Sequence, residues 1–317
     1  MGGFVDDCFN ILKFIFSWVD DKRVWSLAGI IFGLSLLNSF MDVFVDVIDN
    51  PILLLATLPI LLLIGIVIFY YSIKVTLYAL ERKGFGNIEY GVVPFLKYIL
   101  LMIFVSISTF IPWMDKRLLA LSVIIIVGLF VNVLLIMFSG INIAAKIGTG
   151  SFGGIMGFMP ILGLLIAFVI LLFLGMLLWT YIYVRLYAAS YLFLSGRTDI
   201  VNSVRESWGV TDGKVLRIFG LLTIIGVLMM GAVFSVGFAF GFGTALLGVV
   251  ETMLYGGPFI ALAIMTVFYA AMRMFSSFVG SYLGVGIYSM IGPVELPSET
   301  TLEKPVGVRR KARKRVS

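Results

Sequence analysis

The chain has 317 residues, of which 61% are hydrophobic and only 13% are charged, and its mean hydropathy is +1.12. A soluble domain is about 45–50% apolar and about 25% charged, so this composition excludes an ordinary soluble protein. The sequence contains no histidine and a single cysteine, Cys8. These two facts exclude Ser-His and Cys-His nucleophile pairs, the HExxH zinc helix and an intramolecular disulfide framework.

The first segment, residues 4–19, is predicted to be an amphipathic helix in the membrane interface. Its polar residues, such as Asp6, Asp7 and Lys13, lie off one apolar face. This pattern has helical spacing and is typical of helices that lie on a membrane. The same charged residues interrupt the first apolar stretch, so we expect no cleaved signal peptide. The apolar face consists of Val5, Cys8, Phe9, Leu12, Phe16 and Val19.

Seven segments of the chain are apolar enough to be considered as membrane spans, which need about 20 residues each. They cover approximately residues 24–45, 52–73, 97–112, 118–140, 159–184, 217–242 and 258–280. The third is short, ends in Ile111-Pro112-Trp113, and is followed at once by Asp115-Lys116-Arg117. We therefore expect it to lie in the interface or to be re-entrant rather than to cross.

The distribution of basic residues favours six spans. Lys and Arg concentrate on the cytoplasmic side of membrane proteins, and six spans place 21 of the 23 Lys and Arg residues on one side. The exceptions are Lys146 and Arg273. The sequence therefore predicts a multi-pass protein of the plasma or inner membrane with both termini in the cytoplasm. Seven spans are the alternative.

The predicted fold is all-α: one transmembrane helical bundle, residues 1–292, in which six spans form three hairpins, each preceded by a cytoplasmic segment. The predicted boundaries are an interfacial helix at 4–19, a hairpin at 24–73, an interfacial or re-entrant segment at 87–113, a hairpin at 118–184, an interfacial helix at 198–208, a hairpin at 214–291, and a flexible basic cytoplasmic tail at 293–317.

Two joints between an interfacial segment and a span have similar sequences. SWVDDKRVWSLAG begins at Ser17, and ESWGVTDGKVLRIFG begins at Glu206. Trp18 and Trp208 are predicted to anchor the interfacial helices at the depth that tryptophan favours. The acidic and hydroxyl residues that follow, Asp20-Asp21 and Thr211-Asp212, are expected to cap the next helix. The alternative is that these two joints also take part in the function of the protein.

Ionisable residues within spans are functional-site candidates. Arg273 lies about 23 Å from the start of its helix at Pro258, at about 1.5 Å per residue. It either extends to the headgroups or contacts a substrate or lipid phosphate. Asn38, Asp42 and Asp46 form a polar stripe on the first span, which faces a helix seam, water or a polar path.

Small residues predict close helix contacts. The pairs Gly29/Gly33, Gly237/Gly241 and Gly280/Gly284 each have GxxxG spacing, which allows two backbones to approach closely. We expect these pairs to pack within the chain, with a homo-oligomer or partner interface as the alternative. The glycine-rich run from Phe234 to Gly248 is expected to contain a kink or a loose helix end.

The tail ends in a polybasic cluster that is expected to contact anionic lipid headgroups, at about 1 kcal/mol per basic residue near the surface. A simple topology anchor is the other interpretation. We expect no nucleic-acid partner, because no recognition motif lies beside the cluster. The cluster consists of Arg309, Arg310, Lys311, Arg313, Lys314 and Arg315.

The segment from Val184 to Leu222, VRLYAASYLFLSGRTDIVNSVRESWGVTDGKVLRIFGLL, resembles the membrane-domain superfamily named after the membrane portion of glycerophosphodiester phosphodiesterase. That superfamily includes prokaryotic six-helix families of unknown function. The resemblance implies a six-span layout. No catalytic residues belong to this membrane portion in the family, so the resemblance implies no diesterase activity.

These observations predict a non-enzymatic membrane protein that organises the membrane or supports a partner. No catalytic, cofactor-binding or metal-binding residues are expected, and no cofactor. The alternative function is transport of a small solute or lipid, in which Arg273, Asn38 and Asp42 line a path. A continuous polar cavity that reaches Arg273 is expected for a transporter but not for an organising protein.

Overall fold

The computed structural model describes residues 2–47, 51–85, 91–148, 159–196 and 198–291. Within these ranges all regular structure is helical. The elements are α1 (Gly2–Phe16), the 3-10 helix η1 (Ser17–Asp20), α2 (Lys22–Val47), α3 (Pro51–Arg82), α4 (Val92–Phe110), α5 (Lys116–Gly148), α6 (Met159–Leu186), α7 (Ala189–Leu194), α8 (Ile200–Val210), α9 (Val215–Tyr255) and α10 (Phe259–Ile291).

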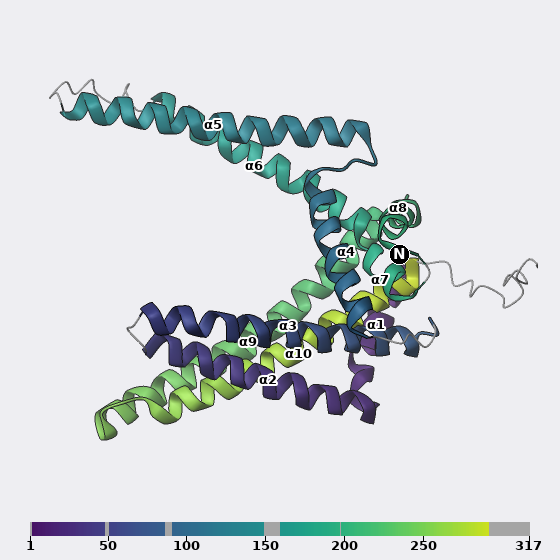
Figure 1. Cartoon of the computed structure of the whole chain (residues 1–317), viewed down its shortest axis with the longest axis vertical. Coiled ribbons are helices and arrows are strands. Elements are labelled where there is room, and N and C mark those ends of the chain that lie inside the picture. The colour runs from purple at the N-terminus through teal and green to yellow at the C-terminus, as the bar shows by residue number, and fades with distance from the viewer. Residues whose placement is uncertain (1, 48–50, 86–90, 149–158, 197, 292–317) are drawn as a thin grey trace, which may run out of the picture.

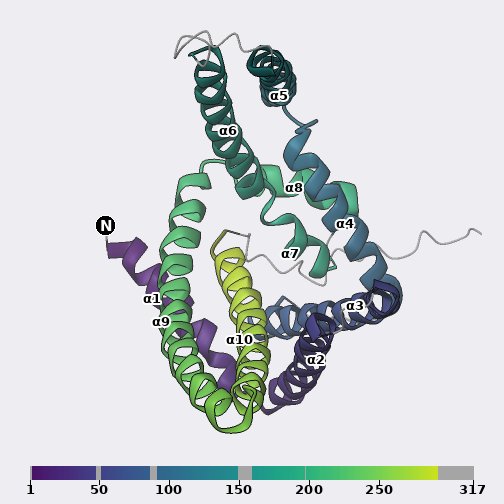
Figure 2. The same ribbon diagram turned by 90° about the vertical axis from the view of Figure 1, so that its left-hand side faces the viewer.

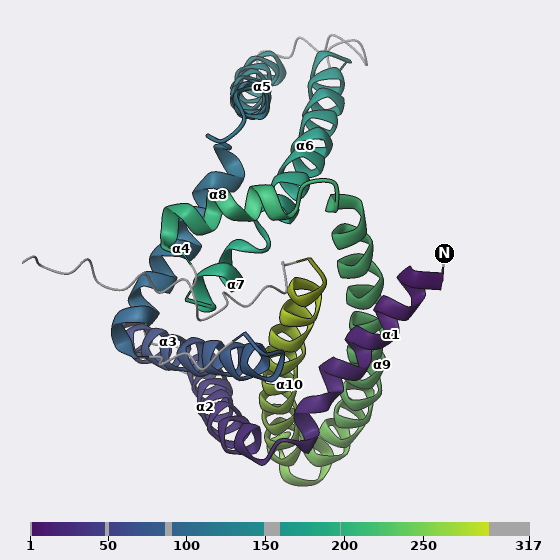
Figure 3. The ribbon, with the colours of Figure 1, turned by 90° about the vertical axis from the view of Figure 1, so that its right-hand side faces the viewer.

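The long helices form three hairpins, α2/α3, α5/α6 and α9/α10, as the sequence predicts. All three point the same way in Figure 1, and the shorter elements lie together at their opposite end. We call this end the base layer, defined by α1, η1, α4, α7 and α8. In Figures 2 and 3, α1 runs across α9 and α10, and α1 packs mainly against α10.

The buried core lies mostly in the base layer and the helix ends that touch it. Tyr282, Tyr288 and Phe278 near the end of α10 are fully buried. Their aromatic contacts join distant parts of the chain: the ring centroids of Trp18 and Phe278 are 4.9 Å apart, and those of Tyr191 and Tyr288 are 5.4 Å apart. The outer halves of the hairpins are instead mostly exposed and apolar. This arrangement is typical of helices whose outer surfaces face lipid.

The hairpin α5/α6 stands apart from the other two (Figure 1). Its helices pack against each other, and α6 also contacts α4, α8 and α9. None of the closely packed helix pairs in the described ranges joins α5 or α6 to α2, α3 or α10. The predicted bundle is therefore open rather than closed: α2/α3 and α9/α10 share a core, and α5/α6 is held through α4, α8 and α9.

The segment that the sequence predicts to be interfacial or re-entrant is α4. It runs crosswise to α3 and α5, between their ends (Figure 1). It is also long and apolar enough to cross a membrane, so the described part of the chain contains seven helices that meet those two criteria. Because α4 lies crosswise, the six-span count stays our prediction, with seven as the alternative.

Reporter fusions distinguish the two counts. With six spans, a phosphatase reporter fused after Trp113 is expected to be inactive, and one fused after Gly257, at the α9/α10 tip, is expected to be active. An active fusion after Trp113 would mean that α4 crosses, and the six-span prediction would then be wrong. A fusion after Arg217 is a second test, because it is expected to be inactive with six spans and active if α4 adds a seventh.

Helix α1 has two apolar faces. Phe9 and Phe16, on the face that the sequence singles out, are 67% and 47% exposed. Ile11 and Ile15, on another face, are buried with Trp18 against α10. One face of α1 therefore holds the helix on the protein, and the other is free for lipid, as an interfacial helix requires.

The prediction of a loose end in the glycine-rich run is wrong. Helix α9 is unbroken from Val215 to Tyr255, through the whole run from Phe234 to Gly248. Backbone N–H and C=O groups in lipid have no water to bond, so they favour intact helix despite the low helix propensity of glycine.

The prediction of close intramolecular packing at the GxxxG pairs is also wrong for most of them. A Cβ added at Gly29, Gly33, Gly237, Gly241 or Gly280 would meet nothing within 4 Å. Only a Cβ at Gly284 would overlap a neighbour, the phenol of Tyr191. These five glycines therefore lie away from the close helix contacts of the described chain, and an interface with another chain stays a prediction.

Candidate functional site

The second joint is built around Arg185, near the end of α6. The Ser207 and Thr211 hydroxyls donate to the Arg185 carbonyl oxygen at 2.9 and 3.0 Å. The Arg185 Nη1 donates to Asp212 Oδ1 at 2.6 Å, and the guanidinium carbon lies 4.7 Å from the centroid of the Trp208 ring. One arginine therefore connects α6, α8 and the turn into α9.

The two charges of this joint lie in different surroundings. The Arg185 side chain is 8% exposed, whereas that of Asp212 is 77% exposed. The hydrogen bond and charge of Arg185 lower the pKa of the Asp212 carboxyl. Within the described residues, the buried Arg185 Nε has no hydrogen-bond partner. The arginine is therefore held by stacking and by one strong ion pair at the surface.

The first joint uses an arginine in a similar way. The Arg82 Nη1 donates to the Ser17 carbonyl oxygen at 2.6 Å, and Arg23 pairs with Glu81 at 3.8 Å. Each joint is thus tied to an arginine near the end of a hairpin's second helix. The sequence comparison of the joints missed both arginines, although their positions at helix ends were a usable signal.

The predicted capping residues behave differently in the two joints. In the first, Asp21 Oδ1 accepts from the Arg23 backbone N–H at 3.0 Å, as predicted. In the second, the residue before α9 is Lys214, which makes no side-chain cap bond. The prediction that Thr211 and Asp212 cap α9 is wrong, because both side chains bond to Arg185 instead.

Both predicted tryptophan anchors are packed against protein. Trp18 is 5% exposed and lies between Trp25 and Phe278. Trp208 is half-buried under the Arg185 guanidinium. Their depth in a membrane stays a prediction, but their position at the base layer suits it.

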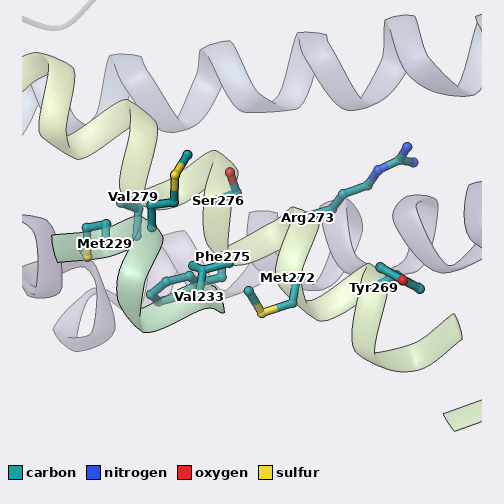
Figure 4. Close-up of a pocket in the computed structure, with 9 residues that line it drawn as sticks. Met229, Val233, Tyr269, Met272, Arg273, Phe275, Ser276 and Val279 are labelled. Atoms are coloured by element: carbon teal, nitrogen blue, oxygen red, sulfur yellow. The ribbon is translucent and has the colours of Figure 1, made fainter. Parts of the chain in front are cut away.

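Arg273 lies on the exposed side of α10, at a groove of about 400 Å³ between α9 and α10. In Figure 4 its side chain extends away from Met229 and Val233, so the guanidinium stands at the rim of the groove. Asn38 is buried, and its Nδ2 donates to Asp42 Oδ2 at 3.0 Å.

The structure does not bring these predicted residues together. An apolar groove between α2 and α10 is lined by Gly33 to Phe40 on α2 and by Phe259 to Val267 on α10. Because α2 and α10 run in opposite directions (Figure 1), Gly33 lies near the level of Thr266 and Phe40 near that of Phe259. Asn38 on α2 therefore lies near the level of the first turn of α10, about 18 Å from Arg273 along the helix axis. The groove at Arg273 includes neither Asn38 nor Asp42, and the groove between α2 and α10 includes none of these three residues. The side chain of Asp46 and the basic cluster at Arg309–Arg315 lie outside the described residues.

Sequence reasoning missed Glu251, which is 4% exposed near the end of α9. Its carboxylate accepts from the backbone N–H groups of Ile260 and Ala261 at 2.7 and 2.8 Å, at the start of α10. A signal was present, because an acid one turn before Gly256-Gly257-Pro258 suits the free amides of the following helix.

The fold and these sites define a polytopic helical membrane protein. Helix lengths and composition support several membrane spans, which confirms the predicted class. The described residues include no group of three or more His, Cys, Asp or Glu that would hold a metal ion.

Comparisons with known proteins add no closer identity. No family model, curated protein or solved structure matches the chain. The resemblance of the Val184–Leu222 segment to the glycerophosphodiester phosphodiesterase membrane-domain superfamily therefore stays a proposal.

Proposed function

We propose that this protein is a non-enzymatic, six-span scaffold of the cell membrane that supports a membrane partner through the hairpin α5/α6. In this proposal the base layer lies at the cytoplasmic interface with both termini on that side. The crosswise α4 supports this placement, because a helix that lies in the interface runs across the spans (Figure 1).

The observation that carries the proposal is the separation of α5/α6 from the other hairpins. Its exposed residues lie on both helices; Phe130 and Phe173, for example, are 64% and 62% exposed. Lipid gives apolar helices no hydrophobic drive to associate, so membrane helices join through packing of complementary surfaces. A hairpin whose close contacts with the rest of the described chain are confined to α4, α8 and α9 leaves most of its surface free for such packing.

Transport of a solute or lipid is the alternative. Arg273 and its groove support it, because ionisable residues within membranes often line a pathway. The other residues of that groove are mostly apolar, and the Asn38–Asp42 pair lies at a different depth. A partner-supporting scaffold therefore agrees better with the described residues than a polar pathway.

Photo-crosslinking in native membranes tests the proposed function. A photoreactive residue at position 130 or 173 is expected to form one discrete protein adduct. The same residue at Leu62, which is 67% exposed on α3, is expected to form none. Loss of the chain is expected to lower the abundance of the crosslinked partner, and the wild-type chain is expected to restore it.

The matched variant replaces Phe130, Phe138 and Phe173 with alanine, which keeps the helices apolar but removes the exposed rings. It is expected to insert normally and to fail to restore the partner. Equal crosslinked adducts from photoreactive residues at positions 62, 130 and 173 would contradict the proposal. Restoration of the partner by the alanine variant would also contradict it.

A further inference from the structure

Three hydrogen-bond donors lie along one face of α10. Tyr269, Arg273 and Ser276 are spaced four and three residues apart, so they share one side of the helix. All three are exposed. Within the ranges that the structure describes, none of their side chains takes part in a hydrogen bond or an ion pair. This side of α10 therefore presents a charged donor and two hydroxyl groups that lack an acceptor.

The same residues border the groove between α9 and α10. Its other lining residues are apolar, and three of the six are methionines: Met229, Met230 and Val233 on α9, and Met272, Phe275 and Val279 on α10. Figure 4 shows that the Arg273 guanidinium stands clear of Met229 and Val233. The site therefore combines a cationic rim with an apolar slot. Methionine side chains adapt readily to a flexible apolar ligand.

The depth of Arg273 follows from a contact of the base layer. Phe278 packs against Trp18, with ring centroids 4.9 Å apart, and it follows Arg273 by five residues, about 7.5 Å along the helix. Tryptophan favours the membrane interface. With Trp18 at the predicted interface depth, Arg273 lies within about one arginine side chain of the headgroup level.

A cation at this place requires an anion. A guanidinium exposed to hydrocarbon is costly unless it is paired, and no carboxylate in the described part of the chain forms an ion pair with Arg273. The phosphodiester of a phospholipid carries a negative charge and several acceptor oxygens, which match the planar guanidinium fork and the neighbouring hydroxyl groups. Its acyl chain matches the apolar slot.

We propose that Arg273, Tyr269 and Ser276 bind the phosphate of an anionic phospholipid whose acyl chain lies in the groove between α9 and α10. This site goes beyond the proposed support of a partner, because it lies on a different hairpin. A phospholipid without a cationic headgroup is the preferred occupant, since no second positive charge then competes with Arg273 for the phosphate.

Native mass spectrometry of the full chain, purified in detergent and titrated with phosphatidylglycerol, tests this proposal. Arg273→Met removes the charge and keeps the length of the side chain. It is expected to weaken binding of the first lipid about tenfold, as loss of a charged hydrogen bond predicts. Val233→Phe fills the groove with Arg273 intact and is expected to weaken binding as well.

The matched control is Arg205→Met, which makes the same charge change at an exposed position on α8. It is expected to leave binding of the first lipid unchanged. Thermal unfolding without added lipid checks that all variants are folded. Equal affinities for Arg273→Met and Arg205→Met would overturn the proposal, because binding would then reflect overall charge or the basic tail.

A competition experiment separates a lipid site from a site for free phosphate. Glycerol phosphate has the phosphate but no acyl chain, and it is expected not to displace phosphatidylglycerol at equal concentration. Efficient displacement would show that the phosphate alone is recognised and would overturn the assignment of the groove to an acyl chain.

Discussion

Replacing Arg185 with alanine is expected to lower the free energy of unfolding by about 2–4 kcal/mol, measured by denaturant titration in mixed micelles. The variant loses stacking on Trp208, which is worth about 2 kcal/mol when desolvated. It also loses the ion pair with Asp212 and leaves a cavity in place of a nearly buried side chain. Because Asp212 is mostly exposed, water solvates its unpaired carboxylate in the variant, and this adds little to the loss of stability.

Two further variants make this prediction specific. Arg217→Ala breaks the ion pair with Asp7, but the Arg217 side chain is 56% exposed, so a loss below about 1 kcal/mol is expected. Arg185→Lys keeps the charge but not the planar stacking surface. Its loss of free energy of unfolding is expected to lie between those of Arg185→Ala and Arg217→Ala. If Arg185→Ala and Arg217→Ala lower the free energy of unfolding by the same amount, then Arg185 does not hold α6, α8 and α9 together.

The sequence predicted the class of the protein and its three hairpins, because both depend on composition and on the length of apolar runs. The positions of the short helices α1 and α8 also followed from local patterns, and their place in the membrane interface stays a prediction. The spacing in residues 4–19 identified one face of α1, although Ile11 and Ile15 on another face form the contact with α10. A helix with two apolar faces shows no sharp polar boundary, so sequence alone did not say which face packs.

The joints show a different limit. Their repeated Ser-Trp and acidic residues located them correctly, but their partners come from distant helix ends. Arg185 precedes Asp212 by 27 residues, and Arg82 lies 65 residues after Ser17. Local propensity predicts a helix cap wherever an acid precedes a helix. In the second joint, Asp212 instead forms an ion pair with Arg185 and does not cap α9.

The GxxxG prediction failed for a related reason. Glycine spacing shows that a close approach is sterically allowed, but not which helix makes it. Helices α2, α9 and α10 do pack against one another, but a Cβ at most of these glycines would meet no atom within 4 Å, so the packing does not use them. The one exception, Gly284, receives a tyrosine from α7 rather than a helix backbone.

Replacing Glu251 with alanine is expected to lower the free energy of unfolding by about 3 kcal/mol, because two charge-assisted hydrogen bonds are worth about 1.5–3 kcal/mol each before the amides find other partners. The carboxylate bonds to the N–H groups of Ile260 and Ala261, at the positive end of the α10 dipole. It thereby closes the turn in which Gly256 has a left-handed backbone with φ of 77°.

Hydrogen exchange distinguishes this cap from a general loss of packing. In Glu251→Ala the amides of Ile260 and Ala261 are expected to exchange faster, while amides of the base layer keep their protection. Glu251→Gln retains one acceptor oxygen, so its loss of free energy of unfolding is expected to be about half that of Glu251→Ala. Thr252→Ala is the control, since the Thr252 hydroxyl bonds only to the Gly248 carbonyl oxygen of its own helix. If the exchange rates at Ile260 and Ala261 do not change, then Glu251 does not hold the start of α10, and the outer tip of the hairpin depends on Gly256 and Pro258 alone.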